Sequence, residues 1–232
     1  MAEDIYEVLN YPERGRNEPL EKTLKDLGVE LIPFGKKKVF GIPILGKGWS
    51  SLVVYGTFNR KKVAVKAQRK DSHRISLARE AAILKITNNY GIGPLLYYEG
   101  KNFLILEYLE GTPIREFEVR KEHILSFLEQ CHTLDLLKID HGQIQGGKHL
   151  LIGKKCSIID FEKAGFRTPR NVSSLVSEIF LRETESAQRM RTQIHLDKEK
   201  VIESIKEYKK THNITRVRSL VSAHSISEAG EY

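Results

Sequence analysis

The sequence predicts an α+β protein in which an antiparallel β-sheet part is followed by a mainly helical part. Two observations carry this prediction. Before residue 108, short β-rich runs alternate with glycine turns, and one helical pattern interrupts them. After residue 108, apolar residues recur at helical spacing in several segments. With 40% hydrophobic and 29% charged residues, the 232-residue chain is ordinary for one globular domain or two modest ones.

The N-terminal stretch predicts two short helices, a strand, a turn and a second strand. Pro19 near the start of the second helix and Gly28 after its end fit the usual positions of proline and glycine at helix ends. The expected elements are the helices Asp4–Leu9 and Pro19–Leu27, and the strands Val29–Pro33 and Val39–Leu45 around a turn at Gly35–Lys38.

Two hairpins and one helix are expected next. Leu52–Phe58 and Lys62–Ala67 read as strands joined by a short turn at Asn59. A helix should begin after Ser72, which can cap it. Its buried face is expected to carry Ile75, Ala78, Ala82 and Ile86. Leu95–Glu99 and Phe103–Tyr108 form the second predicted hairpin.

Helices dominate the second half of the sequence. The segment His123–Leu137 has apolar residues at helical spacing, namely Ile124, Phe127, Leu128, Cys131 and Leu134. Short strands are expected at Leu150–Ile152 and Ser157–Ile159. Another amphipathic helix spans Val172–Phe180, and Asp197 should cap a last one that runs to about Lys210. A polar tail follows.

Net charge, cysteine content and hydrophobicity limit the kinds of partner and compartment that we expect. The net charge of +8 favours anionic partners. The lysines at 36–38 and on the last helix, at 206, 209 and 210, are either solvated or contact nucleic acid. Cys131 and Cys156 are too few for a disulfide framework, so we expect a reducing cytoplasm. No apolar run of membrane-spanning length occurs, so no membrane partner is expected.

A glycine turn between β-rich runs is the first feature with chemical meaning. Gly46 and Gly48 lack a Cβ, so backbone N–H groups there can approach phosphate oxygens. The run Val63-Ala64-Val65-Lys66 then ends in a cation suited to phosphate. The residues expected to line a nucleotide here are Gly46, Gly48, Ser50, Ser51, Val53, Ala64 and Lys66.

The order of these parts resembles the protein-kinase-like fold. Gly46-x-Gly48 with Val53 fills part of a glycine-rich loop, with Ser51 where a third glycine is usual. Glu80 lies in the following helix, where that fold places the partner of the phosphate-binding lysine. Three downstream segments complete the resemblance: the hinge Leu106–Gly111, the catalytic-loop-like Asp140–Ile144, and the metal-loop-like Ile158–Glu162.

The resemblance covers about residues 39–210 and is closest to short atypical kinases. These are the RIO family, the small kinase of the KEOPS complex and archaeal predicted serine/threonine kinases. It implies a bilobal fold, with an antiparallel N-lobe that carries one main helix and a reduced helical C-lobe. The expected domains are an N-terminal extension with the first strand (1–38), the N-lobe (39–108), the C-lobe (109–213) and a mobile polar tail (214–232).

The resemblance also implies ATP and Mg²⁺ as cofactors. Lys66 would hold phosphates, Glu80 would hold Lys66, and both would act with Gln143 as catalytic residues. Asp160, also catalytic, would bind Mg²⁺, because this hard cation prefers carboxylate oxygen. The remaining cofactor contacts implied are Glu107, Tyr108, Leu109 and Lys148.

The sequence departs from the family pattern at the residues that would activate the phosphate acceptor and bind a second metal. Gln143 stands where the family has its catalytic aspartate, and an amide cannot accept a proton as a base. Lys148 replaces an asparagine that binds a second metal. Asp140 lies three residues too early to be the base unless the loop re-aims it. His141 and His149 are expected to be structural.

Several functions remain open on this sequence. The first is an ATP-dependent phosphotransferase with a serine/threonine protein acceptor and an accompanying ATPase activity. The second is a nucleotide-binding pseudokinase or interaction module, favoured by Gln143 and Lys148. The third is a nucleic-acid-associated factor, because RIO resemblance makes an RNA or ribosome partner conceivable by analogy. A small-molecule kinase is the least favoured, since the helical lobe is short.

Overall fold

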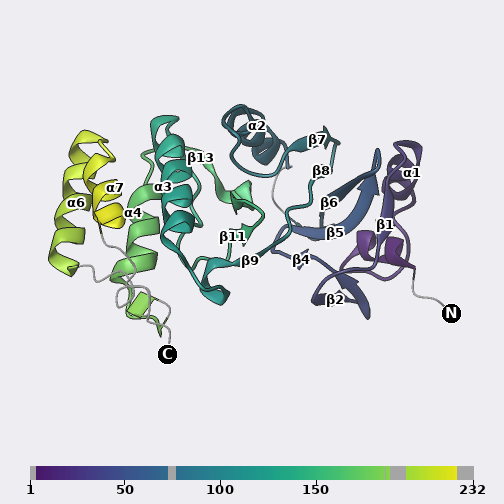
Figure 1. Ribbon diagram of the computed structural model, residues 1–232. Helices are drawn as coiled ribbons and strands as arrows, with labels where there is room; N and C mark the ends of the chain where they lie inside the picture. The colour runs from purple at the N-terminus through teal and green to yellow at the C-terminus, as the bar shows by residue number, and fades with distance from the viewer. Residues whose placement is uncertain (1–3, 73–76, 186, 189–196, 224–232) are drawn as a thin grey trace. The chain divides into compact units, whose positions relative to one another are not determined.

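The computed structural model (Figure 1) describes residues 4–72, 77–185, 187–188 and 197–223, and it confirms the predicted α+β class. The chain forms two compact units. Unit 1 comprises Met1–Asn88 and Pro94–Leu109, and unit 2 comprises Asn89–Gly93 and Glu110–Tyr232. The main sheet lies in unit 1, whereas the longest helices lie in unit 2.

A six-stranded antiparallel sheet forms the centre of unit 1, in the order β1, β5, β6, β8, β7, with β4 also paired to β5. The bounds are Glu30–Ile32 (β1), Gly46–Lys47 (β4), Ser51–Phe58 (β5), Lys61–Gln68 (β6), Leu96–Glu99 (β7) and Phe103–Glu107 (β8). Asn59 and Arg60 join β5 to β6 with φ values of 49° and 62°, as tight hairpin turns require. Both predicted hairpins are therefore confirmed.

The two faces of β6 differ in their surroundings, because side chains alternate along a strand. Val63, Val65 and Ala67 are buried on one face against the N-terminal extension. That extension consists of the short 3₁₀ helix η1 (Ile5–Asn10) and α1 (Glu18–Asp26), both close to their predicted positions. Its core residues are Ile5, Val8, Leu9, Leu20 and Leu24. Lys66 points to the other face.

The turn predicted at Gly35–Lys38 is wrong. The lysines at its end belong to β2 (Lys37–Val39), which pairs with β3 (Ile42–Ile44). The chain reverses instead at Phe40 and Gly41, which have φ values of 54° and 92°. Gly35 lies against the backbone of β3. A Cβ there would overlap the carbonyl oxygen of Ile44, so only glycine allows this close approach.

The helix α2 (Ala78–Thr87) exists as predicted, but its buried face was wrong. Ala78 and Ala82 are exposed, whereas Glu80, Ala81 and Leu84 are buried. The apolar pattern misled because a carboxylate occupies the buried face. Residues 73–76, where the helix was expected to start, lie outside the described part of the chain.

Unit 2 is built on α3 (Lys121–Leu136), whose five predicted apolar residues are all buried. Around it lie α4 (Asn171–Val176), its π-helical continuation η5 (Ser177–Leu181), and α6 (Lys198–Thr211), which Asp197 caps as predicted. The short elements are η2 (Asn88–Tyr90), β9 (Gly111–Pro113), η3 (Ile114–Glu116), β10 (Ile139–Asp140), β11 (Leu150–Gly153), β12 (Cys156–Ile158), η4 (Phe161–Lys163) and β13 (Gly165–Phe166).

The polar tail predicted from residue 214 is corrected in part. Thr215–Ala223 form helix α7, which packs on α3 and α6 (Figure 1). Val217 and Val221, one helical turn apart, are 2% and 1% exposed, so two buried apolar side chains anchor this segment. The remaining residues, 224–232, lie outside the described part. Within the described residues, none of the helices has the length and apolar character to cross a membrane.

Candidate functional site

The glycine turn of unit 1 is closed by its own backbone. β4 pairs with β5 so that Gly46 lies opposite Val53, and the N–H of Gly48 donates to the carbonyl oxygen of Ser51 over 2.8 Å. Ser50 is buried, and within the described residues its Oγ has no hydrogen-bond partner. A buried hydroxyl in this state is a group that a ligand oxygen would satisfy.

Arg69 holds this turn in place, and nothing in the sequence indicated its role. Its Nη1 donates to the carbonyl oxygen of Gly48 over 2.8 Å, and its own backbone N–H donates to the carbonyl oxygen of Ser50, also over 2.8 Å. Asp71 fixes the guanidinium by accepting from Nε and Nη2 at 2.9 and 2.6 Å. This bidentate pair raises the pKa of Arg69 and orients its remaining donor toward the loop.

The N-terminal extension reaches the same place through Tyr11. Lys47 Nζ lies 4.2 Å from the centre of the Tyr11 ring, and the Arg69 guanidinium carbon lies 4.8 Å from it. The Tyr11 carbonyl oxygen also accepts from the N–H of Lys70 over 3.2 Å. One aromatic ring therefore contacts both a residue of the glycine turn and the arginine that supports it.

Lys66 and Glu80 come together as a buried ion pair. Lys66 Nζ, on β6, lies 2.7 Å from Glu80 Oε2, on α2, and the two side chains are 5% and 3% exposed. Desolvating two charges is costly, and their attraction offsets the cost only at close range. Such pairs are retained where a positioned cation has a use, which makes this the most informative pair in unit 1.

The sheet face that carries Lys66 also carries Val53 and Ala64. Val53 lies directly opposite Lys66 in the β5–β6 register, and Ala64 is two residues along β6. Both are half-buried, unlike the residues of the opposite face. The hinge begins at the end of β8, where the N–H of Glu107 donates to the carbonyl oxygen of Leu95 over 2.8 Å. The N–H of Tyr108 donates to the carbonyl oxygen of Lys62 over 3.2 Å. Leu109 is the last residue of unit 1.

In unit 2, His141 braces the loop that follows β10. The side chain is fully buried, and its Nε2 lies 3.1 Å from the carbonyl oxygen of Ile159. Its ring meets that of Phe161 edge-on, with centroids 4.8 Å apart. Burial lowers the pKa of His141 to about 4, so the imidazole is neutral at physiological pH. These contacts fit a structural histidine.

Asn171 holds the same loop through hydrogen bonds to its backbone, and Asp135 in turn holds Asn171. Asn171 Oδ1 accepts from the N–H of His141 over 2.8 Å, and its Nδ2 donates to the carbonyl oxygen of Ile139 over 2.7 Å. Asp135, on α3, accepts from the Asn171 N–H and Nδ2 at 3.0 and 2.7 Å. Neither residue stood out in the sequence, because both are polar residues within apolar helix patterns.

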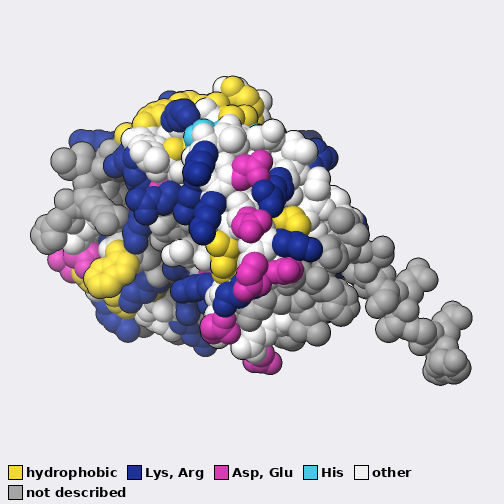
Figure 2. All heavy atoms as spheres, turned by 90° about the vertical axis from the view of Figure 1, so that its left-hand side faces the viewer, with side chains coloured by type: hydrophobic (Ala, Val, Ile, Leu, Met, Phe, Trp, Pro, Cys, Tyr) yellow, Lys and Arg dark blue, Asp and Glu magenta, His cyan; other side chains and the backbone are white. Residues whose placement is uncertain are grey.

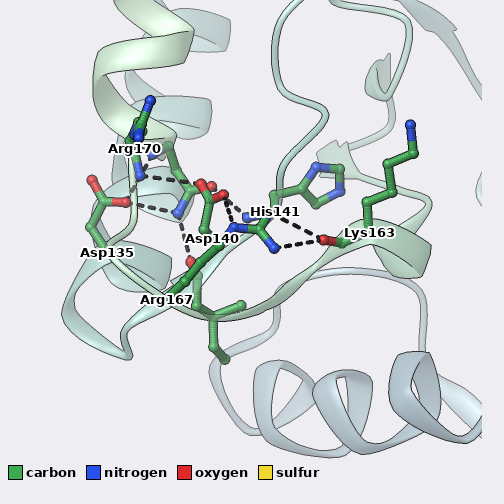
Figure 3. Close-up of polar contacts among 8 residues, drawn as sticks. Asp135, Asp140, His141, Lys163, Arg167 and Arg170 are labelled. Carbon is green, nitrogen blue, oxygen red and sulfur yellow. Dashed lines mark hydrogen bonds and ion pairs between the residues drawn. The ribbon is translucent and has the colours of Figure 1, made fainter.

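Asp140 is held by two donors rather than left as a free base. Its Oδ2 accepts from Arg167 Nε over 2.6 Å, and its Oδ1 accepts from the N–H of Arg170 over 3.2 Å (Figure 3). Arg167 also donates through both terminal nitrogens to the carbonyl oxygen of Lys163. The carboxylate therefore connects β10 to the segment after β13 and is not re-aimed toward a substrate.

Gln143 lies in the same loop and lines a pocket. The side chain is half-buried, and its Oε1 is buried with no hydrogen-bond partner in the described part of the chain. The pocket has a volume of about 360 Å³ and is lined by Asp140, Gly142, Gln143, Ile144, Gln145, Arg167, Thr168, Arg170 and Ser174. Lys148, five residues further on, is exposed.

Asp160 follows β12 in a left-handed conformation, with φ of 64°. One carboxylate oxygen lies 3.3 Å from His149 Nε2, and the side chain is 33% exposed. Among the described residues, no three His, Cys, Asp or Glu side chains gather as they would in an all-protein metal site. Mg²⁺ does not require one, since it commonly binds one or two carboxylates together with phosphate oxygens and water. A half-buried carboxylate at Asp160, open to solvent in part, fits that mode.

The basic surface predicted on the last helix is mixed in charge. Figure 2, viewed from the side of α6 and α7, shows Lys and Arg side chains interspersed with Asp and Glu. Arg216 pairs with Glu207 at 2.6 Å and with Glu203 at 3.0 Å, and Arg218 pairs with Glu129 at 3.3 Å. These pairs involve arginines of α7, and a nucleic-acid contact through Lys206, Lys209 and Lys210 of α6 stays a prediction.

Comparison with known proteins places this geometry in a class. The chain is similar to the autoinhibited serine kinase domain of the giant muscle protein titin, with a TM-score of 0.50 and 16% identity over 80% of this chain and 78% of that one. The chain therefore has a bilobal protein-kinase-like α+β fold, as the motifs predicted. Identity this low carries the fold and not the activity.

A second comparison gives the family. No family model matches the chain. The chain is 34% identical over an alignment of 83 residues to the uncharacterized protein MJ1211 of Methanocaldococcus jannaschii, and the alignment covers 32% of this chain and 72% of that protein. The chain belongs to the same family as MJ1211.

Proposed function

We propose that this protein is an ATP-dependent phosphotransferase of the short atypical kinase type, acting on serine or threonine hydroxyls of a protein. The observation that carries the proposal is the buried Lys66–Glu80 pair, 2.7 Å long, on the sheet face that also bears Val53 and Ala64. Phosphoryl transfer depends mainly on positioning and charge neutralisation, and a held lysine supplies both.

Each residue has a defined role in this proposal. Lys66 neutralises α- and β-phosphate oxygens, and Glu80 keeps its ammonium in place. The Ser50 hydroxyl and the N–H groups of the glycine turn bind phosphate oxygens. Asp160 is the protein ligand for Mg²⁺, which when bound neutralises charge on the phosphates.

Gln143 orients the acceptor rather than deprotonating it. The acceptor hydroxyl oxygen forms a bond to the γ-phosphorus while the bond to the β–γ bridging oxygen breaks and ADP leaves. The hydroxyl proton passes to the transferred phosphate or to solvent, because an amide cannot take it. A loose transition state demands little of a base. Orientation by Gln143 Oε1, which has no hydrogen-bond partner among the described residues, suffices for slow transfer and also for slow ATP hydrolysis.

A nucleotide-binding pseudokinase is the second candidate. Two observations favour it: Gln143 occupies the position of the base, and Asp140 is engaged by Arg167. In this case Lys66 and Asp160 would bind nucleotide without turnover.

The deciding experiment measures ATP binding and label transfer from γ-labelled ATP with Mg²⁺ in the same preparations. Lys66→Met should weaken ATP binding, whereas Lys62→Met, on the same face and strand but exposed, should not. Asp160→Ala should abolish label transfer and phosphate release, and Gln143→Ala should reduce them. Tight ATP binding without any turnover in the wild type would refute the enzyme and leave the pseudokinase. ATP binding that Lys66→Met leaves unchanged would refute the site itself.

A further inference from the structure

The pocket beside Gln143 belongs wholly to unit 2 and is rich in hydrogen-bond donors. Its walls come from the loop after β10 and from the segment that leads into α4. Besides Gln143, the polar residues Gln145, Thr168 and Ser174 line it, together with two arginines. Amides, hydroxyls and guanidinium groups together present donors in several directions, which suits an anion with several oxygens.

The carboxylate of Asp140, which lines the pocket, does not repel an anion there, because it is paired with Arg167. Asp140 Oδ2 accepts from Arg167 Nε, and Oδ1 accepts from the backbone of Arg170. The side chain is only 14% exposed, so its charge is both paired and shielded. Of the two arginines, Arg167 is fully committed to this contact and to the carbonyl oxygen of Lys163.

Gly142 makes that commitment possible. A Cβ at this position would collide with Arg167 Nη2, and the φ of 76° also favours glycine. The Asp140–Arg167 pair is therefore a fixed wall of the pocket, built by close approach of the loop to the arginine. Its net charge is zero.

Arg170 is different, because its side chain is not used by the fold. Its backbone N–H holds Asp140, while its exposed guanidinium has no carboxylate partner among the residues that the structure describes. Figure 3 shows this side chain directed away from Asp140. Since it lines the pocket, the site carries one uncompensated positive charge beside neutral donors.

We propose that this pocket binds a phosphate group of the acceptor, with Arg170 as the principal contact. The inference rests on the function proposed above, and it adds a substrate class: an acceptor that already carries a phosphate near the hydroxyl to be modified. The guanidinium binds two phosphate oxygens in a fork, and the hydroxyls of Thr168 and Ser174 supply further donors. Gln143, in the same pocket, then meets the neighbouring hydroxyl.

The test measures binding of inorganic phosphate and of O-phosphoserine to the full chain by calorimetry, with serine as the comparison that lacks a phosphate. Arg170→Ala should weaken both anions about tenfold to a hundredfold, the range expected for a charge-assisted hydrogen bond. Arg170→Lys should retain part of the binding, because it keeps the charge and loses the fork. Arg79→Ala, an exposed arginine of α2, is the matched control and should bind as the wild type does.

Lys66→Met separates the two anion sites. Phosphate binding that survives Lys66→Met and is lost in Arg170→Ala supports the proposal. Binding lost in Lys66→Met but kept in Arg170→Ala would assign the anion to the glycine loop and overturn it, as would the absence of binding by the wild type at millimolar phosphate. Failure of the proposed function is a separate result, since it appears as an absence of turnover in the wild type or as unaltered ATP binding in Lys66→Met. Only the backbone of Arg170 supports Asp140, so Arg170→Ala should fold, which circular dichroism verifies.

Discussion

Removing the Asp135 carboxylate should destabilise unit 2 strongly. This side chain on α3 is 1% exposed and accepts four hydrogen bonds. Three come from the start of α4: the N–H and Nδ2 of Asn171 at 3.0 and 2.7 Å, and the N–H of Val172 at 3.3 Å. The fourth comes from Tyr208 Oη on α6 at 2.9 Å. Asp135 thus joins three helices.

The expected loss follows from the donors that Asp135→Ala would strand. Tyr208 keeps a second partner, since His132 Nδ1 lies 3.0 Å from its hydroxyl, and Asn171 Nδ2 keeps the carbonyl oxygen of Ile139. The two donors left unpaired are the backbone N–H groups of Asn171 and Val172. A buried unpaired donor costs about 1–3 kcal/mol. Asp135→Ala also removes the free-energy cost of burying the carboxylate, which partly offsets this loss. The same burial raises the pKa of Asp135. We expect a net loss of about 3 kcal/mol in the free energy of unfolding.

Urea unfolding followed by far-UV circular dichroism measures this, because most helices lie in unit 2. Lys206→Ala on the exposed face of α6 is the control and should change the unfolding free energy by less than about 0.5 kcal/mol. A loss below about 1 kcal/mol in Asp135→Ala would refute the reasoning, since it would mean that the stranded donors find water or new partners.

Other predictions concern acid, thiols and the glycine turn. Burial lowers the pKa of His141 from 6.5 to about 4. The contribution of the neutral imidazole to stability is therefore complete above pH 6.5 and is lost as the pH falls through 4. NMR that finds the ring protonated at pH 6 would contradict this. Burial raises the pKa of the Cys131 thiol well above its usual value, so a thiol reagent should modify half-buried Cys156 first, and equal rates would contradict the fold. Arg69→Ala should weaken ATP binding about tenfold by releasing the Gly48 carbonyl; unchanged affinity would show that the turn holds itself.

Local signals in the sequence predicted most of the elements. The apolar spacing of α3, the cap at Asp197 and the turn at Asn59 each depend on residues a few positions apart. The kinase-like fold was predicted by the order of such segments. Sequence also placed Lys66 and Glu80 on adjacent elements, although their functional roles stay a proposal.

The errors share a different cause, which is contact between distant residues. Glu80 lies on the buried face of α2 because Lys66 on β6 meets it, so hydrophobicity along the helix indicated the wrong face. Arg167 reaches Asp140 across 27 residues, and Arg69 reaches Gly48 across 21. Such partners are polar and leave no periodic trace. The helix α7 was missed for a related reason, since this helix, with buried Val217 and Val221, packs in part on α3, which lies far from it in the sequence.

The intrinsic fluorescence of the chain can report on the glycine turn. Trp49 is the single tryptophan, and it stands at the tip of the glycine turn with 90% of its surface exposed. Intrinsic emission excited at the red edge therefore comes from this turn alone and should resemble indole in water. A ligand that closes over the turn would shift that emission to the blue, whereas one bound only beside Gln143 would leave it unchanged. Stopped-flow fluorescence on unlabelled protein can thus time the arrival of nucleotide separately from that of the acceptor.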